Sequence, residues 1–117
     1  MRRDLYSRLV YARRNPLFGR LAYYILKVLG VEIPRSVQIG ADFYLVHGGF
    51  GVVIHPNTVI GDNVRIYPGV VLGRADVHRP IEQSEFEGFV IEDGVILGAG
   101  AKVLCKAGTL TLARGSV

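Results

Sequence analysis

Apolar residues recur at every sixth position along most of the chain. The first residue of each hexad is Ile, Leu or Val, the fifth is mostly small or apolar, and the second is often glycine. A helix repeats its apolar positions at about 3.6 residues and a half-buried strand at about 2, so a period of six fits neither. It fits a coil with flat faces whose corners are turned by Gly or Asn, and its regular recurrence predicts a solenoid. The hexads begin at Ile33, Ile39, Ile54, Ile60, Ile66, Leu72, Ile91, Leu97, Val103 and Leu112.

The repeat is interrupted between Leu45 and Ile54, where nine residues stand in place of six. The stretch reads LVHGGFGVVIH over residues 45–55. The extra residues must bulge out of the coil, and its glycines permit backbone angles that a side chain disfavours. We therefore expect the break to present His47 at the surface of the coil.

A second, longer interruption covers residues 74–90 and mixes charged, aromatic and apolar residues. Long excursions on one face of a solenoid often build a binding site, so we expect this loop to contribute to one. The alternative is a tolerated surface insertion without function.

Residues 4–29 follow a helical pattern in place of the hexads. Leu5 and Leu9 lie on one face, Pro16 interrupts, an apolar face resumes from Leu17, and Gly30 ends the pattern. The later face is formed by Leu17, Leu21, Tyr24, Ile25 and Val28. The sequence therefore predicts two regions, a helical segment over residues 1–30 and a solenoid over residues 31–117.

Charge separates the same two regions. Residues 1–30 hold seven basic residues and one acid, a balance of +6, while the rest holds seven basic and nine acidic residues, a balance of −2. The apolar run of the first region is too short for a transmembrane span. Two interpretations stay open for residues 1–29: a helical pair packed on its own domain or a neighbouring subunit, or a basic amphipathic helix on an anionic membrane surface.

The composition restricts location and partners. Of the 117 residues, one is cysteine, Cys105, which rules out an internal disulfide and agrees with a reducing compartment. We expect a cytoplasmic protein, with membrane-peripheral attachment as the alternative. The solenoid is net acidic and has no basic stripe, which argues against nucleic-acid binding.

The hexads, with the stretches LVHGGFGVVIHPNTVIGDNVRIYPGVVLG and VILGAGAKVL, resemble the hexapeptide-repeat acyltransferases. The similarity is to serine O-acetyltransferases and to related polysaccharide and xenobiotic O-acetyltransferases, over about residues 31–117. It implies an all-β solenoid, a left-handed parallel β-helix with a short N-terminal helical segment. The hand comes from the resemblance alone, because crossovers generally prefer to be right-handed. The resemblance also implies a homotrimer with sites between subunits, acetyl-CoA as co-substrate, a hydroxyl acceptor and no metal.

An O-acetyl transfer needs a base, and a neutral imidazole has a suitable pKa. The histidine of the matching motif is the general base in serine acetyltransferases, so the resemblance assigns that role to His47. Glu32, fifteen residues earlier, matches a family acid and is the candidate partner of the imidazole, unless it is a solvated carboxylate at the junction of helix and coil. His78 in RADVHRP is the second catalytic candidate. Because the family's second histidine aligns with Gly88, either the loop delivers His78 or that role is missing.

The resemblance also points to residues for acetyl-CoA. The small residues Gly98 and Ala99 match the backbone along the pantetheine arm, and Gly73 matches another such contact. The alternative is that small residues suit the packing of a β-helix. Lys102 and Lys106 are placed to meet CoA phosphates as point charges, although surface lysines are usually only solvated.

The acceptor site departs from serine acetyltransferases. Val46 stands where the family has an acid that binds the amino group of serine, and Val77 replaces a basic residue before His78. These differences favour a sugar or polysaccharide-precursor hydroxyl over L-serine, with Asp76 and Arg79 near enough to hold the acceptor. The alternatives are a serine O-acetyltransferase of cysteine biosynthesis and an inactive trimeric scaffold.

The remaining candidates receive structural roles. His55 precedes Pro56 at the second position of its hexad and is interpreted as a corner residue, and Cys105 is not needed as a nucleophile. Family members continue beyond the position of Val117 with at least one more coil and a cap, so we expect the C-terminal coils to be missing.

Overall fold

The computed structural model describes residues 4–117, which form two helices followed by ten short strands. The helices are α1 (Leu5–Ala12) and α2 (Gly19–Val28), and two 3-10 helices are η1 (Val46–Gly49) and η2 (Ile81–Gln83). The strands are β1 (Gln38–Ile39), β2 (Tyr44–Leu45), β3 (Val53–Ile54), β4 (Thr58–Ile60), β5 (Arg65–Ile66), β6 (Val71–Arg74), β7 (Phe86–Ile91), β8 (Ile96–Leu97), β9 (Lys102–Cys105) and β10 (Gly108–Leu112).

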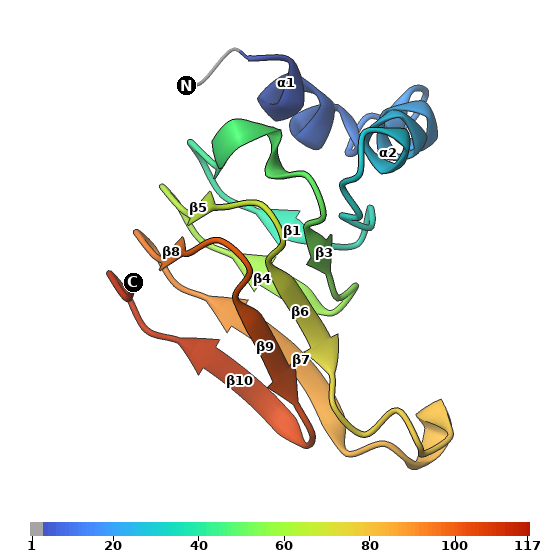
Figure 1. Ribbon diagram of the computed structural model, residues 1–117. Helices are drawn as coiled ribbons and strands as arrows, with labels where there is room; N and C mark the ends of the chain where they lie inside the picture. The colour runs from blue at the N-terminus through green and yellow to red at the C-terminus, as the bar shows by residue number, and fades with distance from the viewer. Residues whose placement is uncertain (1–3) are drawn as a thin grey trace.

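The strands build three parallel sheets, ordered β1-β4-β7-β10, β2-β5-β8 and β3-β6-β9. Each sheet takes every third strand, so the chain visits three faces in turn and forms a β-helix (Figure 1). The register aligns the hexads of successive coils, pairing Ile39 with Ile60 and Leu45 with Ile66. The predicted all-β solenoid is therefore confirmed.

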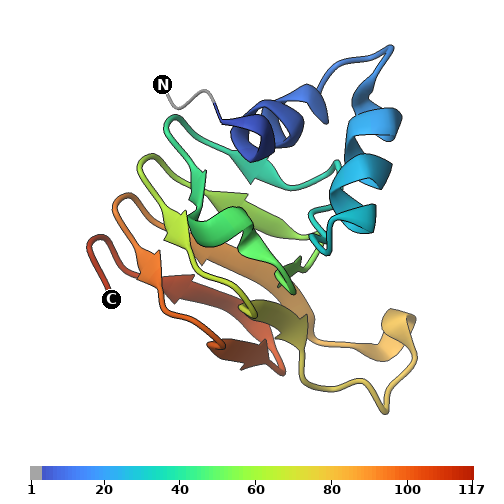
Figure 2. The same ribbon diagram turned by 45° about the horizontal axis from the view of Figure 1, so that its top comes forward.

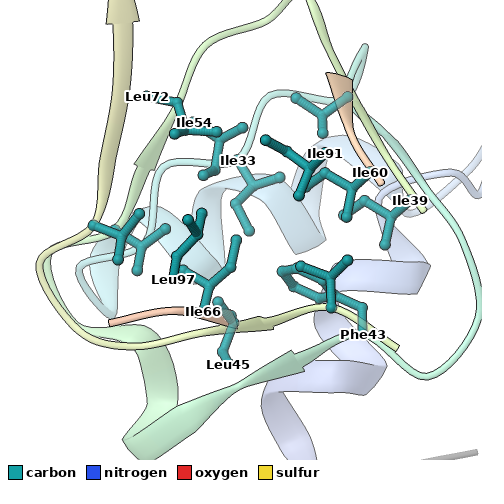
Figure 3. Close-up of a cluster of buried hydrophobic side chains, with 14 of the residues drawn as sticks. Ile33, Ile39, Phe43, Leu45, Ile54, Ile60, Ile66, Leu72, Ile91 and Leu97 are labelled. Atoms are coloured by element: carbon teal, nitrogen blue, oxygen red, sulfur yellow. The ribbon is translucent and has the colours of Figure 1, made fainter. Parts of the chain in front are cut away.

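The hexad positions fill the interior of the coils. Figure 3 shows first-position side chains from different coils pointing toward one another, with Phe43 from a fifth position among them. Each fully buried side chain of this size contributes roughly 1.5–3 kcal/mol to folding. Eight of the ten hexad starts are buried, and so is Leu45, which opens the interrupted stretch. The eight are Ile33, Ile39, Ile54, Ile60, Ile66, Leu72, Ile91 and Leu97.

The two helices cover one end of the β-helix (Figures 1 and 2). The carboxylate of Asp4 caps α1 by accepting from the backbone N–H of Ser7 at 2.9 Å. Just beyond α1, the fully buried Arg13 donates to the carbonyls of Pro34 and Val37. Its burial, with the charge of nearby arginines, lowers the pKa of Arg13 to about 10, so the guanidinium stays charged at neutral pH. Arg13 thus fastens the helical segment to the first coil.

The helices begin and end close to their predicted bounds, but the packed face of α2 differs from the apolar face seen in the sequence. Ala22 and Leu26 are buried beneath α2. The side chains of Leu17, Leu21, Tyr24, Ile25 and Val28, which mark that face, are exposed. Small residues such as Gly19 and Ala22 let the helix approach the coil on its opposite side.

The second interruption is shorter than the predicted loop 74–90. Arg74 still belongs to β6, and residues 86–90 belong to β7, so the loop covers residues 75–85. β7 is extended because it pairs with β10 along its length and because the Phe86 ring packs edge-on against His55, with the ring centroids 4.7 Å apart. The loop projects outward from the corner between β6 and β7, away from the helices (Figures 1 and 2).

Candidate functional site

His47 lies in η1, where the first interruption leaves the coil. Its backbone is left-handed, with φ 54° and ψ 30°, and Gly48 and Gly49 follow with φ values of 78° and 65°. A left-handed conformation costs a residue with a side chain roughly 1–2 kcal/mol, so the surrounding structure must impose it. His47 is exposed, while Val46 before it is buried. The predicted surface placement of His47 is confirmed.

The two glycines after His47 are required by close packing. A Cβ on Gly48 would lie 2.8 Å from Cζ of Tyr6 in α1, and a Cβ on Gly49 would lie 2.8 Å from Cδ2 of Leu45. Both separations are shorter than real Cβ contacts allow. The bulge is therefore clamped between α1 and its own coil, and this clamp fixes the backbone from which the imidazole projects.

Glu32 lies beside the far end of the same bulge. Its backbone pairs with Val53, donating to the Val52 carbonyl at 2.8 Å and accepting from the Ile54 N–H at 2.8 Å. Its carboxylate accepts a hydrogen bond from the Tyr23 hydroxyl. This hydrogen bond is the main reason why the pKa of Tyr23 is raised.

Lys27 completes the surroundings of the Glu32 carboxylate. Its Nζ lies 3.6 Å from Oε2, and the Glu32 side chain is 28% exposed. Glu32 is therefore neither freely solvated nor, among residues 4–117, hydrogen-bonded to His47; it is tied to α2. Its pairing with the His47 imidazole stays a prediction.

The loop 75–85 carries the other predicted acceptor and catalytic residues. Asp76 is 1% exposed and accepts a hydrogen bond from Ser84 Oγ at 2.7 Å, while Arg74 Nε lies 3.0 Å from its other oxygen. The Ser84 hydroxyl first, and the Arg74 charge less strongly, hold the pKa of this carboxyl below its usual range against the effect of burial. Arg79 is joined to this network through its backbone N–H and carbonyl. His78 is exposed on a turn.

The loop does not bring His78 to His47 within one chain. Figures 1 and 2 show the loop leaving the β-helix at the corner between β6 and β7 and projecting away from η1, which lies between β2 and β3. Gly88 is the position with which the resemblance aligned the family's second histidine. A side chain does not fit there, because a Cβ would lie 2.4 Å from the Asn57 carbonyl oxygen. A site with two histidines from these segments would have to combine two chains.

His55 is placed as a corner residue. Its Nδ1 accepts from the backbone N–H of Asn57 at 3.0 Å, and its ring packs on Phe86. Desolvation, and then the charge of Arg74, lower the pKa of His55. The neutral imidazole is therefore favoured at neutral pH, in agreement with the structural role predicted for it.

The residues predicted for acetyl-CoA lie along β6, the β8–β9 corner and β9. Gly73 is half-buried, and a Cβ there would meet Leu104 at an ordinary 3.4 Å. Gly98 and Ala99 are exposed at the corner, and a Cβ on Gly98 would meet nothing within 4 Å. Lys102 is exposed and donates from Nζ to the Gly69 carbonyl. Within the described residues, packing does not require the glycine at position 98.

Reasoning from the sequence missed the partners of the acidic residues. Tyr23 and Lys27 are four residues apart on α2, a spacing that places them on one helix face, and this was the available signal. Nothing in the sequence marked Ser84 and Arg74 as partners of Asp76. Across residues 4–117, His, Cys, Asp and Glu side chains do not gather in threes to form a possible metal site.

Comparison with known proteins places these features in a family context. The family described as bacterial transferase hexapeptide (six repeats) matches residues 30–74. A plasmid-borne serine acetyltransferase of Synechococcus elongatus is 42% identical over 112 residues, covering 92% of this chain and 34% of that protein. The serine acetyltransferase of Helicobacter pylori is 35% identical over 111 residues, covering 86% of this chain and 60% of that protein. The chain thus spans only part of the length of these relatives.

Solved structures give the same result for the fold. A truncated serine acetyltransferase apoenzyme matches with a TM-score of 0.65 and 27% identity, over 94% of this chain and 43% of that one. Serine acetyltransferase isoform 3 of Entamoeba histolytica, solved with cysteine, matches with a TM-score of 0.61 and 29% identity, over 85% and 38%. The resemblance to hexapeptide-repeat acyltransferases and the left-handed parallel β-helix are confirmed.

Proposed function

We propose that this chain, which has the fold and the hexapeptide repeat of the serine acetyltransferases, transfers an acetyl group from acetyl-CoA to the hydroxyl of L-serine. The observation that carries the proposal is the exposed His47, held in a left-handed bulge of the first coil, between β2 and β3. A base that must reach a substrate hydroxyl needs this combination of a fixed backbone and an accessible ring.

The proposed reaction is a direct attack without a covalent enzyme intermediate. The neutral His47 imidazole takes the proton of the acceptor hydroxyl while its oxygen forms a bond to the thioester carbonyl carbon of acetyl-CoA. The C–S bond then breaks, and the CoA sulfur leaves with the proton that His47 returns. The glycine-rich bulge is suited to present backbone N–H groups to the developing oxyanion.

Glu32 is the proposed partner that orients the imidazole. A carboxylate on the second ring nitrogen would fix the tautomer and stabilise the imidazolium formed during transfer. The contacts from Tyr23 and Lys27 support this role, because they keep the Glu32 carboxylate in place beside the end of the bulge.

The choice of L-serine reverses the preference that we drew from the sequence. The relatives and the solved neighbours are serine acetyltransferases, and one of them, from Neisseria gonorrhoeae, was solved with serine. The sugar hydroxyl remains as a second candidate because of one observation: Val46 provides no carboxylate for an amino group, and its side chain is 9% exposed. Asp76 and Arg79 stay candidates for acceptor binding, through a loop whose base their contacts hold together.

We further propose that acetyl-CoA lies along Gly73, Gly98 and Ala99, with Lys102 near its phosphates. The open space at Gly98 supports this placement, since packing within the described coils gives no reason for a glycine there. The projection of loop 75–85 away from η1 supports a homotrimer in which the loop of one chain, with His78, meets the bulge of the next. We propose a cytoplasmic location, with peripheral attachment to a membrane through the helical segment.

The experiment that tests the function measures release of the CoA thiol by the protein and by His47→Ala, with L-serine and with a panel of sugars. The proposal is supported if the parent releases CoA with L-serine and the His47→Ala variant does not. Release with a sugar and not with serine would assign the chain to the second candidate. No release with any acceptor from a folded oligomer would contradict acetyl transfer and leave the scaffold interpretation.

A further inference from the structure

The outward face of α2 is an apolar surface without a partner in the described chain. Leu17 is 83% exposed and Val28 is 88% exposed, although both are large aliphatic side chains. The opposite face is packed on the first coil through Ala22 and Leu26. A helix that is apolar on both sides is normally buried on both sides. We therefore expect a binding partner to cover the outer side of α2. The exposed set is Leu17, Phe18, Leu21, Tyr24, Ile25 and Val28, which we call the outer α2 face.

Most of the charges around the outer α2 face are positive. The nearby acid is Glu32, whose carboxylate lies 3.6 Å from Lys27 Nζ and accepts a hydrogen bond from Tyr23. Arg14, Arg20 and Arg35 are exposed, Lys27 is more than half exposed, and residues 5–31 contain no acid. A second copy of the chain laid face to face would bring these like charges together, which argues against α2–α2 packing. The charge pattern instead fits an apolar surface with an anionic rim, as at the headgroup boundary of a phospholipid bilayer.

Two adjoining hollows on α2 fit the two halves of such a lipid. One, of about 330 Å³, is lined by Arg20, Tyr23, Tyr24, Pro34 and Arg35. The other, of about 250 Å³, is lined only by Tyr24, Ile25, Val28 and Leu29. Tyr24 borders both, so a cationic hollow lies next to an apolar one.

The cationic hollow has the chemistry of a phosphate site. Arg35 Nε donates to the Arg13 carbonyl at 3.1 Å, which fixes the guanidinium and leaves its terminal N–H donors for a ligand. Arg20 provides a second guanidinium on the same hollow. Guanidinium groups bind phosphate oxygens in pairs of hydrogen bonds, and they lose less hydration than ammonium groups do.

We propose that α2 lies in the plane of a bilayer rich in anionic phospholipid. The lipid phosphate occupies the hollow between Arg20 and Arg35, while Tyr24, Ile25 and Val28 rest among the upper acyl chains. The contact is interfacial: α2 has 10 residues, and none of the helices in residues 4–117 has the length and apolar character to cross a membrane. This surface does not include His47 or loop 75–85, so the inference holds or fails separately from acetyl transfer.

Flotation of the full chain with vesicles tests this inference. We expect the protein to float with vesicles of equal parts phosphatidylcholine and phosphatidylglycerol, to float poorly with phosphatidylcholine alone, and to dissociate as salt is raised. Arg20→Glu should lower partitioning about tenfold or more, because it reverses one charge at the surface. Val28→Ser should lower it about tenfold through lost apolar contact.

Matched controls are Lys106→Glu and Val77→Ser, which change the same residue classes at exposed positions away from α2. They should partition like the parent, and the far-UV circular dichroism of every variant should match it. Equal flotation with neutral vesicles would overturn the preference for anionic phospholipid. Full release from anionic vesicles by millimolar inorganic phosphate at constant ionic strength would show that the hollow binds free phosphate, and would overturn the contact with the bilayer. The protein could also fail to float and form an oligomer that Val28→Ser dissociates. That result would show that another copy of the chain covers this face, and it would overturn the membrane assignment.

Discussion

The two interruptions of the hexad repeat are held in place by different kinds of interaction. The first, at η1, is a short bulge in which three successive residues from His47 have left-handed backbone angles, and it is clamped by Tyr6 of α1. The second, residues 75–85, is a longer loop whose base is closed by the buried Asp76 with Arg74 and Ser84. One relies on close packing against glycine, and the other on a polar network.

The difference matters for what each segment can present. Close packing at Gly48 and Gly49 holds the backbone that follows His47, so the exposed imidazole has a defined position relative to its own coil. A polar network fixes only the base of the longer loop, and His78 lies on an exposed turn beyond it. The proposed intersubunit site requires these two parts: an imidazole at a fixed position on one chain, and a loop that reaches outward from another chain.

The largest effect is expected from His47→Ala, which should lower kcat for acetyl transfer about 10²- to 10⁴-fold, because it removes the proposed general base. His78→Ala should have a smaller effect, since it does not supply that base. Steady-state CoA release gives both values, with circular dichroism as the control for folding. An equal or larger loss from His78→Ala would reverse the assignment of the two interruptions.

Mixing the two variant chains sharpens the comparison. If each site combines the η1 bulge of one chain with loop 75–85 of another, oligomers reassembled from His47→Ala and His78→Ala chains contain some sites with both histidines. Activity should then rise above that of either variant alone. Activity equal to the average of the separate variants would place both histidines of a working site on one chain, or show that His78 takes no part.

Gly48→Ala should destabilise the protein by about 1–3 kcal/mol, because it combines an unfavourable φ of 78° with a Cβ 2.8 Å from the Tyr6 ring. Gly98→Ala is the matched control, since its Cβ meets nothing within 4 Å, and it should leave stability within about 0.5 kcal/mol. Urea unfolding measures both. Adding Tyr6→Ala to Gly48→Ala should recover only the part of the lost unfolding free energy that comes from the contact with the Tyr6 ring. If Gly48→Ala is as stable as the parent, packing does not fix the bulge.

These two interruptions also show where sequence reasoning succeeds. Glycines beside a break in a strict repeat indicate unusual backbone angles, so the exposed position of His47 could be predicted from residues 45–55 alone. The inward-facing hexad positions were predictable for the same reason: a period of six admits few structures. Local patterns are sufficient where the structural cause lies within neighbouring residues.

The features that could not be predicted from the sequence depend on contacts between residues distant in the chain, or on which of two helix faces is packed. The extension of β7 results from Phe86 meeting His55, thirty-one residues earlier, and no local pattern signals that contact. The attachment of Glu32 to Tyr23 depends on how α2 docks. Both faces of α2 are apolar, so the sequence did not show that Ala22 and Leu26, the less conspicuous set, would be the packed one.

Asp76→Asn should loosen the base of the second interruption, because the amide keeps the shape of the carboxylate but loses its charge beside Arg74. The effect is local, and the rate of proteolytic cleavage within residues 75–85 measures it. The control is Asp93→Asn, which makes the same substitution in an exposed ion pair with Arg114. The folded pKa of Asp76 is lowered, so its contribution is complete above the ordinary carboxyl pKa of 3.8 and is lost as pH falls below it. The difference between parent and variant should therefore disappear in acid, and a difference that persists there would show that the charge is not what holds the loop.

The smallest effect concerns His55, where the second interruption rejoins β7. Burial lowers the pKa of His55 below its ordinary 6.5, so an NMR titration should place it under that value, and Phe86→Ala should raise it by exposing the ring. The folded state binds its proton less readily than the unfolded state does, so the stability contribution of His55 is complete above pH 6.5 and declines as pH falls toward the folded pKa. At the first interruption His47 is exposed, and within residues 4–117 no aromatic ring packs on its imidazole in this way. If Phe86→Ala leaves the pKa of His55 unchanged, then the ring contact is not what shields it, and the extension of β7 must rest on its pairing with β10 alone.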